Sequence, residues 1–148
     1  MPQKISLRDP FLQNTGKTIL VVEDEVDLLD VIGQVLSGAG YRVIVAHTAA
    51  EAVLICGHME ESIDIILSDF NLPGGNGSRL AKSVGAIRPN LPVVFMTGNY
   101  TAFDRLTSLG FTVLQKPFSF ADMEYTVGKT LADSALSHSF EIDKSEAS

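Results

Sequence analysis

The chain alternates short apolar runs with segments of helical periodicity, and this alternation constrains its fold more than any other feature. Runs rich in β-branched and aromatic residues predict five strands, at residues 18–22, 41–46, 63–68, 92–97 and 111–115. The first intervening segment shows the helical spacing best, at Leu28, Leu29, Ile32, Val35 and Leu36. Buried strands that alternate with amphipathic helices predict an α/β fold, in which right-handed crossovers cover both faces of a parallel sheet.

Local signals predict where several of the helices begin and end. Thr48 with Glu51 three residues later predicts a capping box at the start of the second helix. A short helix of weak propensity is expected over residues 101–109. Ser119 is expected to cap the last helix, which should end at about Ala132.

The length fits a single domain, because 148 residues with 45% hydrophobic content are enough for a real core. Residues 1–16 are polar and are interpreted as a leader or linker. Residues 17–133 contain all the predicted strands and helices and form the expected domain. Residues 134–148 are polar and are expected to be a frayed tail.

Composition argues against several classes of function. A formal net charge of −7 repels DNA phosphates, so direct binding of nucleic acid is not expected. The single cysteine, Cys56, excludes an internal disulfide and fits a reducing cytosol. No apolar run approaches the roughly 20 residues that a membrane helix needs, and the first residues lack a signal-peptide core. We therefore expect a cytoplasmic protein with no membrane association.

Polar side chains stand at the carboxyl ends of the predicted strands, which meet at one edge of a parallel sheet and commonly bind ligands there. They are Glu23, Asp24, Asp69, Thr97 and Lys116. Three carboxylates brought together repel one another and favour a cation, and their hard oxygens suit Mg²⁺. An amine and a hydroxyl beside them suit an anionic group. This combination indicates phosphoryl chemistry, in which a carboxylate is itself the nucleophile and gives an aspartyl phosphate.

Each of these residues also has an ordinary structural role. Glu23 and Asp24 could be first-turn residues favoured by the helix dipole. Asp69 could be a capping or Asx-turn residue, Thr97 could simply end its strand, and Lys116 before a proline could belong to a turn. The five together, at correctly ordered strand ends, argue against five separate structural roles.

Four motifs that carry these residues occur in the order and spacing of a known family. They are residues 18–25, 69–77, 95–98 and 114–118. Over about residues 17–133 the sequence resembles the receiver domain of bacterial two-component response regulators. The resemblance implies a flavodoxin-like (βα)5 fold, a doubly wound parallel sheet with strand order 2-1-3-4-5.

The resemblance also implies a metal site and a phosphoacceptor. Asp69 is the expected phosphoacceptor, which takes a phosphoryl group from a phosphohistidine. Mg²⁺ is expected to be bound by Asp24, Asp69 and the backbone carbonyl of Asn71, with Glu23 acting mainly through water.

The remaining motif residues are expected to act on the phosphoryl group. The resemblance implies that Thr97 and Lys116 contact it and that Pro117 follows a cis peptide bond. The implied partner is a histidine kinase or a histidine phosphotransfer protein. The domain would catalyse only its own phosphorylation and slow dephosphorylation, so it would not be an enzyme acting on an external substrate.

The sequence leaves several alternatives open. Residues 95–98 and 113–118 look most like receivers at the C-terminus of hybrid histidine kinases, so both a hybrid-kinase receiver and a stand-alone regulator fit. A phosphate-independent interaction module on the same fold is a second interpretation. A Mg²⁺-dependent phosphatase is a third, but Asn71 stands where a second acid would be needed.

Two further expectations concern regulation. Receivers of this family carry an aromatic residue three positions before the lysine, but this chain has Val113, so the usual threonine–aromatic coupling cannot operate there. A monomer or weak dimer is expected, because residues 121–129 lack the charge pattern of receivers that dimerise through this helix, and Gly128 weakens it.

Overall fold

The computed structural model describes residues 16–58 and 62–146, and five parallel strands form its central sheet. The order across the sheet is β2-β1-β3-β6-β7. The strands are β1 (Thr18–Val22), β2 (Arg42–Ala46), β3 (Ile65–Asp69), β6 (Val93–Thr97) and β7 (Thr112–Gln115). Counted along the chain, these five strands have the order 2-1-3-4-5, so the predicted flavodoxin-like α/β fold is confirmed.

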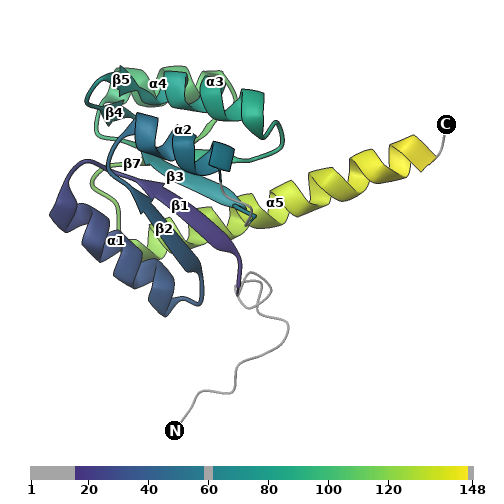
Figure 1. Cartoon of the computed structure of the whole chain (residues 1–148), viewed down its shortest axis with the longest axis horizontal. Coiled ribbons are helices and arrows are strands. Elements are labelled where there is room, and N and C mark those ends of the chain that lie inside the picture. Colours follow the sequence, from purple (N-terminus) through teal and green to yellow (C-terminus); the bar gives the residue numbers. More distant parts are fainter. Residues whose placement is uncertain (1–15, 59–61, 147–148) are drawn as a thin grey trace, which may run out of the picture.

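Five helices cover the two faces of this sheet (Figure 1). They are α1 (Val26–Gly38), α2 (Ala49–His58), α3 (Gly77–Ile87), α4 (Tyr100–Ser108) and α5 (Phe120–Glu146). Helices α1 and α5 lie on one face, and α2, α3 and α4 lie on the other (Figure 1). Within the described residues, no helix combines the length and the apolar content that crossing a bilayer requires.

The predicted helix caps are present. The Thr48 hydroxyl accepts a hydrogen bond from the Glu51 N–H at 3.1 Å, while the Glu51 carboxylate accepts from the His47 N–H at 3.1 Å. Ser119 accepts from the Asp122 N–H at 3.0 Å. These side chains satisfy backbone donors that the first turn of a helix leaves without partners.

The end predicted for the last helix is wrong. Helix α5 continues without interruption past Ala132 to Glu146, into the stretch expected to be a frayed polar tail. The sequence from Lys129 onward contains neither glycine nor proline, the residues that most strongly end helices. The predicted leader, apart from Gly16, lies outside the described residues.

A short antiparallel pair was not predicted from the sequence. Strands β4 (Asn71–Leu72) and β5 (Gly75–Asn76) form it in a stretch that contains none of the five predicted strands. Gly74 joins the two strands with φ +82, a backbone conformation that favours glycine. The pair leads into α3, whose first turn is capped by the Asn76 side chain accepting from the Arg79 N–H at 3.3 Å.

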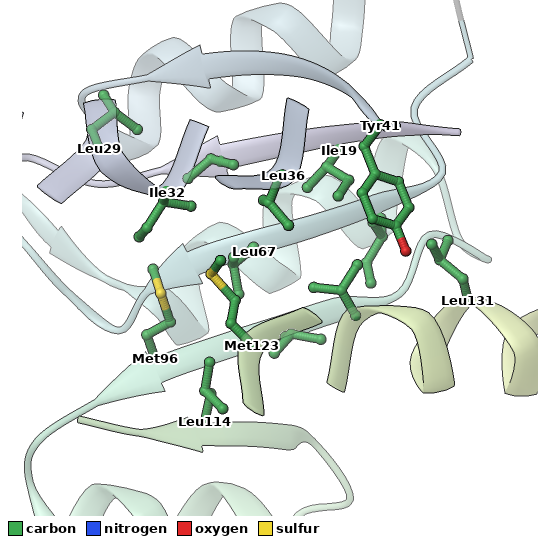
Figure 2. Packing of buried hydrophobic residues seen from close by; sticks show 14 residues of the cluster. Ile19, Leu29, Ile32, Leu36, Tyr41, Leu67, Met96, Leu114, Met123 and Leu131 are labelled. Carbon is green, nitrogen blue, oxygen red and sulfur yellow. The ribbon is translucent and has the colours of Figure 1, made fainter. Parts of the chain in front are cut away.

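The core consists of apolar layers on both faces of the sheet. All five residues of β1 and all five of β3 are buried. On one face, Leu67 and Met96 of the sheet pack with Ile32 of α1 and Met123 of α5 (Figure 2). The opposite layer, under α2 and α3, contains among others Leu20, Ile66 and Leu80. The two-sided burial explains why these strands are continuous apolar runs in the sequence.

The contrast between two leucines of α5 gives a stability prediction. Leu131 is 6% exposed and belongs to the core cluster beside α1, whereas Leu136, five residues later, is 65% exposed. We expect Leu131→Ala to lower the free energy of unfolding by about 2–4 kcal/mol, because it leaves a cavity. Leu136→Ala is the matched control and should change it by less than about 0.5 kcal/mol. Urea unfolding measures both, and equal losses in the two variants would contradict this packing of α5.

Candidate functional site

Four strands of the sheet end at one edge. A predicted site residue is either the last residue of each strand or directly follows it. Glu23 and Asp24 follow β1, Asp69 is the last residue of β3, Thr97 is the last of β6, and Lys116 follows β7. The register keeps these ends level, since Val22 pairs with Ser68, Asp69 with Met96 and Thr97 with Gln115. The parallel sheet therefore brings together side chains that are up to 93 positions apart in the sequence.

Three carboxylates form the acidic part of this site. Glu23, Asp24 and Asp69 each offer an oxygen, and these oxygens all lie within 4.8 Å of one another. Glu23 is 1% exposed and Asp69 is 7% exposed, whereas Asp24 is open to solvent. Buried carboxylates at this separation repel strongly, and an oxygen-only donor set of this kind fits a hard divalent cation.

The Lys116 ammonium lies between the two buried carboxylates. Its Nζ is 3.3 Å from Oδ2 of Asp69 and 3.5 Å from Oε2 of Glu23. The Lys116 N–H donates to the Thr97 carbonyl at 2.8 Å, and the peptide bond to Pro117 is cis, as predicted. The lysine thus offsets part of the negative charge and is available to an anionic ligand.

Backbone N–H groups hold the Asp69 carboxylate and the Thr97 hydroxyl. Oδ1 of Asp69 accepts from the Asn71 N–H at 3.1 Å, so both oxygens of this carboxylate are held, one by a backbone amide and the other by Lys116. Thr97 is fully buried, and its hydroxyl oxygen accepts from the Asn99 N–H at 3.1 Å. These contacts fix the orientation of the Asp69 and Thr97 side chains.

The electrostatics of the site are most visible at Glu23. Burial and the nearby Asp69 carboxylate raise the pKa of Glu23 from 4.5 to about 7, and Asp24 contributes in the same direction. Lys116 and the Glu25 N–H, which donates to Oε1 of Glu23 at 3.3 Å, lower the pKa and only partly offset the increase. Burial of the carboxylate is the largest cause of the raised pKa, and the neighbouring carboxylates add to it.

Comparison with known families identifies this arrangement. The sequence profile of the response regulator receiver domain matches residues 19–127. The chain belongs to this family. The receiver motifs noted in the sequence thus lie in a domain with the receiver fold, and receiver domains of two-component signalling interact with histidine kinases or phosphotransfer proteins.

Known receivers are similar to this receiver domain in sequence and in structure. The transcriptional regulatory protein ZraR of Klebsiella oxytoca is 31% identical over 124 residues, which are 82% of this chain and 28% of ZraR. The solved receiver domain of the hybrid histidine kinase CckA is 32% identical with a TM-score of 0.67, and the match covers 77% of this chain and 98% of that one.

A receiver from Methanospirillum hungatei JF-1 superimposes with a TM-score of 0.75 at 26% identity, covering 83% of this chain and 99% of that one. The chain matches between 22% and 28% of the length of four curated relatives.

The sequence predicted the side chains of the site but missed part of what holds them. The five strand-end residues all meet at one edge, as expected. The hydrogen bond from the Asn99 N–H to Thr97 was not anticipated, and no sequence signal distinguishes it, because it depends on the local path of the backbone. Asn71 was expected to contribute its carbonyl, but its N–H also holds Asp69.

The raised pKa of Glu23 predicts how stability depends on pH. The folded receiver holds this proton more tightly than the unfolded chain does, so its contribution is complete below pH 4.5 and is lost as pH rises toward about 7. In metal-free buffer we expect the free energy of unfolding of wild type to fall across this range, relative to Glu23→Gln, by up to about 3 kcal/mol. Urea unfolding of both proteins at several pH values measures the difference. Parallel profiles would show that Glu23 does not titrate in this way.

Proposed function

We propose that Asp69 is the phosphoacceptor of this receiver domain and takes a phosphoryl group from a phosphohistidine of a histidine kinase or phosphotransfer protein. The observation that supports this most is the placement of Asp69 itself. Asp69 is the last residue of the central strand β3, and its carboxylate is buried. The Lys116 Nζ lies 3.3 Å from Oδ2 of Asp69, and the carboxylates of Glu23 and Asp24 lie nearby. A carboxylate oxygen of Asp69 attacks phosphorus, a P–O bond forms, the P–N bond to the histidine breaks, and the imidazole leaves with the bonding electrons.

The side chains of the site have distinct parts in this transfer. Asn71 holds Oδ1 of Asp69 through its N–H, which keeps the nucleophile oriented at the edge of the sheet. Lys116 now contacts Oδ2 and would share its ammonium with the oxygens of the incoming phosphoryl group. The Thr97 oxygen already accepts from Asn99, so its own proton is available for donation to a phosphoryl oxygen.

Mg²⁺ is the proposed cofactor, because the donor set fits it. Asp24 and Asp69 would bind it together with the backbone carbonyl of Asn71, and Glu23 would act mainly through water. The bound metal would offset negative charge on the phosphoryl oxygens during transfer. Burial is the largest cause of the raised pKa of Glu23, and the neighbouring Asp69 and Asp24 carboxylates add to it; a divalent cation would offset their charge.

The proposed domain modifies itself and turns over no external substrate, so it is not an enzyme in the usual sense. The similarity to the CckA receiver and to ZraR leaves both a hybrid-kinase receiver and a separate regulator compatible with this chain. Output domains of the longer relatives are not assigned to it. A purely phosphate-independent module would have no use for the assembled carboxylates, lysine and threonine.

Replacing the acceptor tests the proposal directly. We expect wild type incubated with acetyl phosphate and Mg²⁺ to gain the mass of one phosphoryl group and to lose it in hydroxylamine, as acyl phosphates do. Asp69→Asn should gain none, because the amide is not a nucleophile of this kind. Asp133→Asn changes an exposed aspartate of α5 and is the control. Intact-protein mass spectrometry measures all three, and equal labelling of Asp69→Asn and wild type would exclude Asp69 as the acceptor.

A second substitution tests the metal site. Asp24→Asn should weaken Mg²⁺ binding about tenfold or more, because it removes a charged ligand from the acidic cluster. Asp27→Asn, three residues later in the first turn of α1, removes an exposed charge of the same kind and should leave the affinity within about twofold. Isothermal titration calorimetry with MgCl₂ compares them. An unchanged affinity in Asp24→Asn would rule out this ligand.

A further inference from the structure

Gly77, eight residues beyond Asp69, lies against two aromatic rings. It is the buried first residue of α3, and a methyl group placed on it would lie 2.5 Å from Cε1 and 2.9 Å from Cδ1 of Phe95. The same methyl group would lie 3.0 Å from Cδ2 of Phe70. These separations are shorter than carbon atoms tolerate without displacement, so a side chain at this position requires the rings to move.

The backbone of Gly77 does not itself require glycine. Its φ is not among the positive values, which occur at Gly16, Gly40, Gly74 and Gly110. In a helix, alanine is favoured over glycine by about 1 kcal/mol. The two rings are therefore the physical reason that this position excludes a side chain.

Both rings are packed against neighbouring residues. Phe95 is fully buried, and its ring makes edge contacts with Phe70 at a centroid distance of 5.6 Å and with Phe111 at 5.1 Å. The Phe70 N–H donates to the Met96 carbonyl at 2.9 Å, and the Phe70 carbonyl accepts from the Gly77 N–H at 2.7 Å. A methyl group at residue 77 would thus push on rings that are held from several sides.

Both rings belong to segments that carry the site. Phe70 directly follows Asp69 and precedes Asn71, whose N–H holds the Asp69 carboxylate. Phe95 lies two residues before Thr97 on β6, so the two side chains project from the same face of the strand. Displacement of either ring therefore reaches Asp69, its backbone donor or Thr97.

We propose that Gly77 is a positioning residue for phosphoryl transfer. By excluding a side chain, it lets Phe70 and Phe95 pack in the arrangement that aligns Asp69 with Thr97. This inference rests on the proposed phosphoacceptor function. It adds a residue that contacts neither phosphoryl group nor metal but acts on both through two phenylalanines.

The test compares glycine and ring variants by their rate of phosphorylation from acetyl phosphate, under conditions where circular dichroism verifies that each is folded. Gly77→Ala should be phosphorylated about tenfold or more slowly than wild type, since small misplacements of reacting groups have effects of this size. Gly85→Ala in the same helix is the matched control, because its added methyl group meets nothing within 4 Å, and its rate should match wild type.

Rescue separates positioning from general loss of stability. In Phe95→Leu the ring atom nearest residue 77, Cε1, is gone, so adding Gly77→Ala to that variant should change its rate by less than about twofold. The proposal is overturned if Gly77→Ala is less stable but phosphorylated at the wild-type rate, or if the methyl group has the same effect in the Phe95→Leu background. If Gly77→Ala does not fold, Phe70→Leu tests the same contact, and a wild-type rate in that variant overturns the proposal.

A readout without phosphorylation keeps this inference separate from the proposed function. The backbone amides of Asn71 and Asn99 each donate to a site side chain, so their NMR chemical shifts report the positions of Asp69 and Thr97. Both should shift in Gly77→Ala and not in Gly85→Ala. Absence of phosphorylation in wild type would refute the phosphoacceptor function, whereas unchanged shifts at Asn71 and Asn99 would refute the role of Gly77.

Discussion

Repulsion between carboxylates at one edge of the sheet is the constraint around which this receiver domain is built. Glu23 and Asp69 are both almost completely buried, and one ammonium, that of Lys116, lies within 3.5 Å of each. Folding must therefore supply enough apolar burial elsewhere to hold two acids where neither is well solvated. The buried strands β1, which Glu23 follows, and β3, whose last residue is Asp69, provide that burial. Core and site are parts of the same two strands.

The same constraint links charge to ligand binding. Burial and the neighbouring carboxylates disfavour the charged form of Glu23, as its raised pKa indicates, and a bound cation would offset the charge of these carboxylates. An incoming phosphoryl group adds negative charge of its own and competes for Lys116. The proposed roles of Mg²⁺ and of Lys116 are therefore interdependent, because both offset the negative charge of the carboxylates and of the phosphoryl group.

Most of the fold and the site's side chains were predictable, because their signals are local. A strand buried on both faces is mostly apolar, so the runs ending at Val22 and Leu67 could be recognised, and parallel topology then brings the ends of these strands together. Other features depend on tertiary contacts or on weak signals. Nothing in the sequence near Gly77 reveals that Phe95 will lie against it, and the polar composition after Ala132 concealed a helix that continues because nothing stops it.

Helix α5 has 27 residues, and Leu131 of the core cluster lies 15 residues before its last residue, Glu146. The C-terminal part of the helix extends away from the sheet (Figure 1). The remaining four turns rise about 1.5 Å per residue, or roughly 22 Å in all, as one continuous rod. When a rigid helix is fixed at one end, a change in its tilt displaces the other end in proportion to the length between them. A tilt of about 10° with its pivot near Leu131 would carry the far end through about 4 Å. The length of this helix beyond Leu131 would therefore turn a small change of its angle at the sheet into a larger displacement of its far end.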